Sequence, residues 1–94
     1  MKSDLPNPLI RQLKAQAQRM DATLKVGKHG LSAEFLKSVD EVLKHRALIK
    51  VKFTEFKEQK KELAPVLADK TASNLVQLIG NVAVLYRAKP ANKE

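Results

Sequence analysis

The sequence of 94 residues contains no cysteine and no tryptophan, and its only aromatic residues are three phenylalanines and one tyrosine. Because cysteine is absent, disulfide frameworks, thiolate nucleophiles and zinc sites built on thiolates are excluded. No apolar stretch approaches the length of a membrane span, so we expect a cytoplasmic protein that does not enter a membrane. The hydrophobic fraction of 44% is still enough for one compact domain of this length.

Acidic residues are scarce relative to basic ones. Ten Asp and Glu residues stand against eighteen Lys and Arg residues, which gives a formal net charge of +8 and a pI near 9.9. A field of this sign attracts polyanions over long range, and the usual partners are nucleic acids or anionic membranes. The simpler interpretation is a solvated surface rich in lysine. Because a basic footprint is a first clue to nucleic-acid binding, we favour a nucleic-acid partner.

Groups suited to catalysis are also few. The serines and the two histidines do not assemble into a pair of nucleophile and base, and Ser32 is better explained as a helix cap. Glu41 and His45 lie four residues apart on one predicted helix and could begin a metal site, but such a site needs a third or fourth ligand. We therefore predict that the protein is not an enzyme and that it holds no metal and no cofactor.

Two segments show uninterrupted helical periodicity. In residues 9–20 apolar side chains recur at spacings of three and four, as one face of a helix requires. The same spacing returns after Ser32, a good N-cap, and continues to residues 45–46, where cations suit the helix C-terminus. The inward residues expected on these helices are Leu9, Leu13, Ala17 and Met20, then Leu36, Val39, Val42 and Leu43.

A third helix is predicted over about residues 56–70, with Leu63, Val66 and Leu67 facing inward. Pro65 lies inside this segment. It should either kink the helix or mark the start of a second short helix, because proline lacks the N–H that a helix interior needs. The sequence leaves both alternatives open.

Two strands are predicted on either side of the second helix. Residues 23–26 form the first strand, and residues 48–53 form the second. In the second strand Ile49, Val51 and Phe53 alternate with two lysines, so these apolar residues share one face and the lysines share the other. We expect the lysine face to be exposed to solvent.

A hairpin is predicted at the end of the chain, because residues 75–79 and 82–86 flank Gly80-Asn81, a pair suited to a tight turn. Both arms are apolar on both faces, so helices should cover much of both sides of the sheet. The order helix, strand, helix, strand, helix, strand, strand predicts an α/β fold with three helices and a small mixed four-stranded sheet. The strands around the second helix should be parallel, with a right-handed crossover, and the last two antiparallel.

We predict one domain over residues 9–88, between a flexible leader of residues 1–8 and a flexible tail of residues 89–94. Pro6 and Pro8 should hold the leader extended, and Pro8 also suits the first turn of the first helix. The tail is polar and is expected to fray. No feature of the sequence sets the oligomeric state, and we favour a monomer.

The loop Gly27-Lys28-His29-Gly30 joins the first strand to the second helix. Two glycines permit backbone geometry closed to other residues, and they let a ligand come close. Lys28 and His29 should project outward, just before the free N–H groups of the helix, where phosphate binds readily. KH domains hold the nucleotide backbone with a GxxG loop as well. Taken alone, however, the loop is more simply interpreted as a tight turn.

Other basic residues could extend a nucleic-acid-binding face around this loop. If the first two strands pair in parallel, their lysines lie near it, and the first helix and the end of the last strand add further cations. Solvent exposure alone would also explain each cation. The candidates are Lys25, Lys50, Lys52, Arg87, Arg11 and Lys14, in addition to Gly27, Lys28, His29 and Gly30.

The four aromatic residues could stack on bases. Core packing better explains Phe35, Phe53 and Phe56, which sit at or beside positions expected to face inward. Tyr86 is open to either interpretation, because it adjoins Arg87 near a strand end.

Three segments, taken together, resemble one known family. They are Leu24-Lys25-Val26-Gly27-Lys28-His29-Gly30-Leu31-Ser32, Leu48-Ile49-Lys50-Val51-Lys52 and Gln77-Leu78-Ile79-Gly80-Asn81-Val82-Ala83-Val84-Leu85-Tyr86-Arg87. They resemble the CRM domain, the chloroplast RNA splicing and ribosome maturation domain, of which bacterial YhbY-type proteins are stand-alone members. The resemblance covers residues 9–87 and keeps the order of the motifs. Residues 27–30 match its loop and Arg87 matches its Leu-Tyr-Arg ending, whereas Pro65 departs from the pattern.

The resemblance implies a fold similar to the C-terminal domain of translation initiation factor three. It also implies RNA binding through the GxxG loop and the neighbouring basic residues. Bacterial members are associated with precursors of the large ribosomal subunit, and plant members assist group II intron splicing. We therefore expect an RNA-binding ribosome assembly factor that contacts large-subunit ribosomal RNA precursor.

Two other functions would use the same features. A nonspecific DNA-binding or nucleoid protein would rely on the same positive charge, and competition between duplex DNA and ribosomal RNA at fixed salt would distinguish it. A protein-interaction module would carry its basic charge incidentally, and its binding would depend only weakly on salt.

Overall fold

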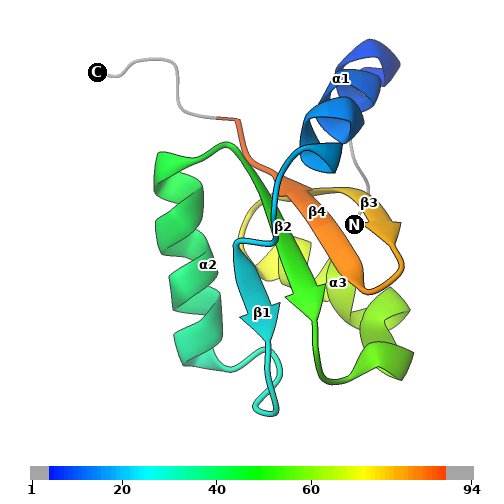
Figure 1. Ribbon diagram of the computed structural model, residues 1–94. Coiled ribbons are helices and arrows are strands. Elements are labelled where there is room, and N and C mark those ends of the chain that lie inside the picture. The colour runs from blue at the N-terminus through cyan, green and yellow to red at the C-terminus, as the bar shows by residue number, and fades with distance from the viewer. Residues whose placement is uncertain (1–4, 89–94) are drawn as a thin grey trace.

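The computed structural model describes residues 5–88 (Figure 1). The predicted α/β order is confirmed, with one short 3₁₀-helix, η1, added before the third α-helix. The elements are α1 (Asn7–Gln18), β1 (Leu24–Val26), α2 (Ala33–His45), β2 (Leu48–Phe53), η1 (Lys57–Gln59), α3 (Lys60–Lys70), β3 (Asn74–Ile79) and β4 (Val82–Tyr86). The predicted tail, residues 89–94, and residues 1–4 of the predicted leader lie outside the described residues.

The four strands form one mixed sheet in the order β1-β2-β4-β3. As predicted, β1 and β2 are parallel, and β4 is antiparallel to β3; it is also antiparallel to β2. Because β1 and β2 run in the same direction, the segments that follow them leave the sheet at the same edge, the lower one in Figure 1. We call this the loop edge; it holds residues 27–30 after β1 and residues 54–56 after β2.

Helices α2 and α3 cover one face of the sheet. The predicted alternation in β2 is confirmed, because Ile49, Val51 and Phe53 are all fully buried on this face. They pack with Val39 and Leu43 of α2 and with buried residues of α3 and β4 in the main core. Both helices therefore brace the strands that lead to the loop edge.

Helix α1 covers the other face, and only at the end of the sheet away from the loop edge (Figure 1). Its predicted inward residues Leu13 and Ala17 are buried against Leu48 of β2 and Val84 of β4. The rest of this face, where Lys52 is exposed, carries no helix. The sequence-based expectation that helices cover much of both faces is thus met on one face and only partly on the other.

Helix α1 begins at Asn7, two residues before the predicted start. Pro8 occupies its first turn, where the N–H that proline lacks has no partner inside the helix in any case. Residues 7 and 8, which were predicted as part of the leader, therefore lie in α1.

The start of the third helix was predicted too early. Phe56 adopts a left-handed backbone with φ of 58°, which cannot begin a helix, and η1 intervenes before α3 starts at Lys60. Helix α3 then runs through Pro65 without dividing into two. Pro65 deprives the Lys61 carbonyl of its donor, but Lys61 is exposed, so water can take that place.

The inward face of α3 also differs from the prediction. Val66 is 40% exposed, whereas Ala64, Leu67 and Ala68 are fully buried. Their spacing of three and four defines the stripe, and Val66 lies outside it. The prediction considered only the large apolar residues as inward-facing and did not include the two alanines of the stripe.

Candidate nucleic-acid interface

The Gly27–Gly30 loop is a closed turn at the loop edge. The Gly30 N–H donates to the Gly27 carbonyl over 3.0 Å, and Gly30 has a positive φ of 64°, which favours glycine. Between the two glycines, Lys28 and His29 are both exposed, as predicted. Gly27 does not have a positive φ, so only one of the two glycines is needed for the turn itself.

The start of α2 opens directly onto this loop. Ser32 is the predicted N-cap, and its Oγ accepts a hydrogen bond of 3.1 Å from the Phe35 N–H. The N–H groups of Ala33 and Glu34 precede this bonded group and have no partner within a helix. An open hollow lies here, lined by Gly27, His29, Gly30, Ser32, Glu34, Phe35 and Ser38. The arrangement suits an anion, although exposed Glu34 brings one negative charge to the rim.

Two further lysines lie beside the loop. Lys25 of β1 and Lys52 of β2 are paired across the parallel ladder, and both are exposed. Each precedes the last residue of its strand by one position, so both side chains stand at the loop edge, on the face that α1 leaves open. The structure thus brings together Lys25, Lys52 and the loop, as the sequence predicted for parallel strands.

Lys50 has a different environment from the one predicted. Its Nζ donates to the Ala17 carbonyl over 2.9 Å and to the Met20 carbonyl over 2.8 Å, and its side chain is partly buried. The Ala17 carbonyl lies in the last turn of α1 and the Met20 carbonyl lies just after the helix, where the helix dipole favours a cation. Lys50 therefore fastens α1 to the sheet, and its ammonium group is already bonded to these acceptors.

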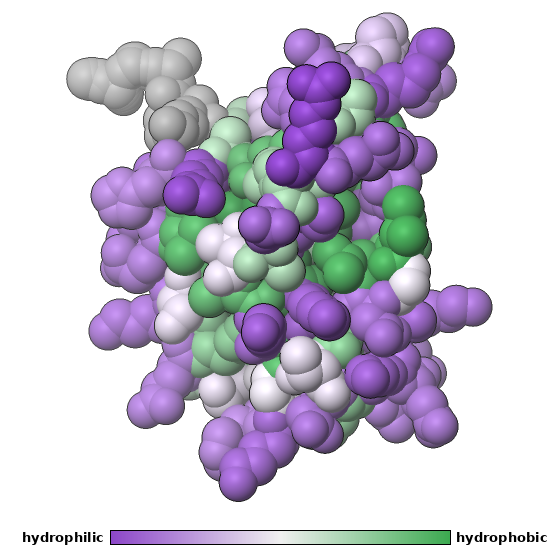
Figure 2. Space-filling view, in the orientation of Figure 1, coloured by the Kyte–Doolittle hydropathy of each residue, from purple (hydrophilic) through white to green (hydrophobic). Residues whose placement is uncertain are grey.

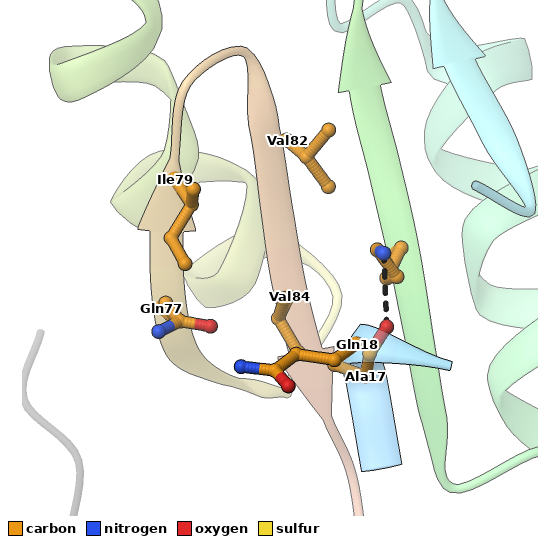
Figure 3. Close-up of a pocket in the computed structure, with 7 residues that line it drawn as sticks. Ala17, Gln18, Gln77, Ile79, Val82 and Val84 are labelled. Atoms are coloured by element: carbon orange, nitrogen blue, oxygen red, sulfur yellow. Dashed lines mark hydrogen bonds between the residues drawn. The ribbon is translucent and has the colours of Figure 1, made fainter. Parts of the chain in front are cut away.

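Figure 3 shows the hollow beside this contact. Ala17 and Gln18 of α1 face Gln77 and Ile79 of β3 and Val82 and Val84 of β4, and the dashed line marks the hydrogen bond to Ala17. The lining is mainly apolar, and Ile79 is 56% exposed. Figure 2 shows exposed hydrophobic atoms on this side of the molecule, below α1. The hollow exists because α1 ends before it covers the hairpin.

Arg87 also has an intramolecular role. It follows β4 at the end of the sheet opposite the loop edge, and its Nη2 donates to Asp40 Oδ1 over 2.7 Å and to the Thr71 carbonyl. The hydrogen bond from Arg87 is the main cause that lowers the pKa of Asp40 below its ordinary value; the nearby charge of Lys44 acts in the same direction. Arg87 thus joins β4, α2 and the end of α3, and it does not lie with the loop.

The cations of α1 are separate as well. Arg11 is exposed and Lys14 is partly buried, on a helix that Figure 1 shows at the opposite end of the sheet from the loop. Of the residues predicted to bind, the structure therefore gathers six at one edge. They are Lys25, Gly27, Lys28, His29, Gly30 and Lys52.

Two residues at this edge were missed or misjudged from the sequence. Phe56 was expected in or beside the core, but it is 40% exposed next to Gly30. Lys57 follows it and is exposed. Parallel pairing was the signal that could have found them, because it requires the segment after β2 to emerge beside the segment after β1. Phe35 and Phe53 do pack in the main core, as predicted.

Comparison with known proteins identifies the family. Residues 5–87 match the model of the CRS1/YhbY (CRM) domain, which is nearly the whole of the described chain. The chain is a CRM domain. The resemblance seen in its three sequence segments is thereby confirmed.

Relatives of this CRM domain carry RNA-binding names. The probable RNA-binding protein YqeI of Bacillus subtilis is 36% identical over 85 residues, which covers 89% of this chain and 88% of that protein. The probable RNA-binding protein MJ0652 of Methanocaldococcus jannaschii is 35% identical and covers 99% of this chain, which in turn spans 71% of that protein.

A solved structure shares the fold. The solution structure of the hypothetical protein SAV1595 from Staphylococcus aureus, described as a candidate RNA-binding protein, superposes with a TM-score of 0.78 at 38% identity. The match covers 95% of this chain and 94% of that one. Within residues 5–88 of the CRM domain, no helix is long and apolar enough to cross a membrane.

Proposed function

We propose that this CRM-domain protein binds RNA at the loop edge. The observation that carries the proposal is the gathering of Lys25, Lys28, His29 and Lys52 at the loop edge, where the N-terminus of α2 also opens. Lysine ammonium groups and free backbone N–H groups both pair with phosphate oxygens. The RNA-binding names of the relatives favour RNA over other polyanions.

The proposed interface is smaller than the one expected from the sequence. Lys50 and Arg87 are left out because their cationic groups are bonded within the protein. Arg11 and Lys14 are left out because α1 lies at the other end of the sheet. In this proposal the loop holds an RNA phosphate. Lys25 and Lys52 contact the neighbouring phosphates of the RNA strand, which crosses the part of the sheet that α1 leaves open.

We further propose that the bound RNA is large-subunit ribosomal RNA in a precursor particle, which the protein meets in the cytoplasm. The support is the resemblance to bacterial YhbY-type proteins, which are associated with such precursors. The proposed role is binding as an assembly factor, without catalysis and without a cofactor.

The test is ultraviolet crosslinking in cells followed by sequencing of the bound RNA, for the wild type and for Lys28→Asp with His29→Asp. We expect wild-type crosslinks on large-subunit ribosomal RNA precursor and their near loss in the variant. Thermal melting of the variant should be unchanged or slightly higher, because carboxylates before α2 favour its dipole by about 0.3–1 kcal/mol.

The matched control is Arg11→Asp with Gln12→Asp on α1. Both double variants lower the formal charge by three, two from the cation and one from the neutral residue, so +8 becomes +5 in each. The control should keep most of the crosslinking. Equal losses in the two variants would refute a role for the loop, and crosslinks spread over messenger RNA would refute the ribosomal target.

A further inference from the structure

Phe56 is held beside the loop by the backbone around it. The N–H groups of Thr54 and Glu55 both donate to the Val26 carbonyl over 3.2 Å, and Thr54 Oγ1 donates to the same oxygen over 2.7 Å. Val26 is the residue just before Gly27. Three hydrogen bonds therefore fasten the segment after β2 to the end of β1, so the two loops form one continuous surface.

The ring of Phe56 lies against the loop itself. A β-carbon placed on Gly30 would come within 3.3 Å of Phe56 Cε2 and 3.5 Å of Cζ, so the absence of a side chain at Gly30 makes room for the ring. The ring is nevertheless 40% exposed. Among residues 5–88 it is the one aromatic ring in the group of exposed large hydrophobic side chains, which otherwise contains Val66 and Ile79.

The backbone of Phe56 makes this position unusual. Its φ of 58° and ψ of 35° lie in the left-handed region, which a bulky L-residue adopts only at an energetic cost, and glycine or asparagine would fill it more easily. The Phe56 carbonyl accepts from the Gln59 N–H over 3.0 Å in the turn that follows. The fold thus holds a strained residue so that its ring stays half open to solvent beside the loop.

We propose that Phe56 is a stacking site for one unpaired RNA base, whose backbone is held by residues 27–30. This inference rests on the proposed function. A base stacks on an aromatic ring whatever its identity, because every base presents a π face. Since the ring lies beside Gly30, the proposed phosphate and base subsites lie within the span of one nucleotide. Exposed Lys57 stands next to the ring and can meet the following phosphate.

The alternative role of Phe56 is to anchor the loop by apolar contact alone. Phe56→Leu separates the two roles, because leucine keeps an apolar contact with Gly30 but offers no π face. Phe56→Trp keeps the π face and, since the chain contains no tryptophan, supplies a single fluorophore at the site. Thermal melting of both variants checks that the fold is retained.

The probes are two RNA hairpins with a short single-stranded extension, one of uridines and one of abasic nucleotides, so that both carry the same phosphate charge. We expect the wild type to prefer the uridine extension by about tenfold, as stacking on one base allows. Phe56→Leu should bind both hairpins equally, with the affinity that the wild type has for the abasic one. The fluorescence of Phe56→Trp should be quenched by the uridine extension and not by the abasic one.

Retention of the uridine preference in Phe56→Leu, or an unquenched Phe56→Trp, would overturn the stacking site. If the wild type binds both hairpins equally while Lys28→Asp with His29→Asp weakens both, the proposed RNA-binding loop stands and the stacking site falls. If the wild type binds neither hairpin, the proposed function itself fails.

Discussion

Gly27 and Gly30 close the same turn under different constraints. At Gly30 the positive φ and the nearby ring of Phe56 both disfavour a side chain. At Gly27 the φ is not positive, and a β-carbon would meet no atom within 4 Å. The fold therefore does not explain the glycine at position 27. Close approach of a ligand to the backbone would explain it, because a methyl group there would stand between the chain and a bound phosphate.

This contrast predicts opposite outcomes for two alanine substitutions. Gly27→Ala should leave stability unchanged or raise it by about 0.4–1 kcal/mol, through a less flexible unfolded chain, and should weaken RNA binding. Gly30→Ala should lower stability by about 1–2 kcal/mol, because alanine resists the left-handed region. Urea unfolding and RNA titration of both variants provide the measurements. Unchanged RNA affinity in Gly27→Ala would show that no ligand approaches the backbone there.

The sequence could not show which individual basic residues are free and which are bonded within the protein. Lys50 and Lys52 share one face of β2, and both were expected to be exposed and free, yet only Lys52 is. The difference arises because the end of α1 lies over Lys50, which is a tertiary contact between residues 30 and 33 positions apart. Arg87 was predicted to contact RNA but is bonded to Asp40 instead. The sequence did not indicate this pair because Asp40 lies 47 positions away along the chain.

At the scale of elements, the sequence was sufficient to predict the helices and strands whose structure depends on a local pattern. The bounds of β2 and β4 were predicted to the residue, and the Ser32 cap and the inward stripe of α2 are confirmed. The start of α3 was predicted too early because Phe56 adopts a left-handed backbone, which residue propensities do not indicate. The segment before Phe56 is held in place by hydrogen bonds to Val26 of β1. The loop and its neighbouring lysines were predictable, because parallel pairing follows from the strand–helix–strand order.

The link between α1 and the sheet can be tested with the two lysines of β2. Lys50→Met keeps the apolar stem but removes the donor to two helix-end carbonyls, and we expect a loss of about 1.5–3 kcal/mol of stability, as for hydrogen bonds of a charged group. RNA affinity should not change. Lys52→Met is the matched control, because it makes the same change two residues away on the same face.

For Lys52→Met we expect the reverse result. Stability should stay within about 0.5 kcal/mol of the wild type, as for an exposed side chain without a partner, and RNA affinity should fall. Urea unfolding measures the first quantity and RNA titration the second. A stable Lys50→Met variant with weakened RNA binding would show that Lys50 leaves α1 to contact RNA.

At the scale of the whole molecule, the net charge of +8 overstates the charge available to a ligand. Lys44 pairs with Asp40 and Glu41, Lys60 donates to Asn81 Oδ1, and Lys50 and Arg87 are bonded as described. Within residues 5–88, the lysines at the loop edge have no such partner. They are Lys25, Lys28, Lys52 and Lys57.

These four lysines set the expected salt dependence of RNA binding. Contacts to about three or four phosphates predict a slope of log K against log salt of roughly −2 to −4, because each neutralised phosphate releases about 0.7–0.9 of a counterion. Lys52→Ala should make the slope shallower by about one, as the loss of one phosphate contact requires. Lys44→Ala removes the same charge from a surface cation that is already paired, and it should leave the slope unchanged. Titrations from low to physiological salt measure all three slopes. A wild-type slope near zero would remove the electrostatic basis of the interface, and an equal change in both variants would mean that the net charge attracts RNA without a defined edge.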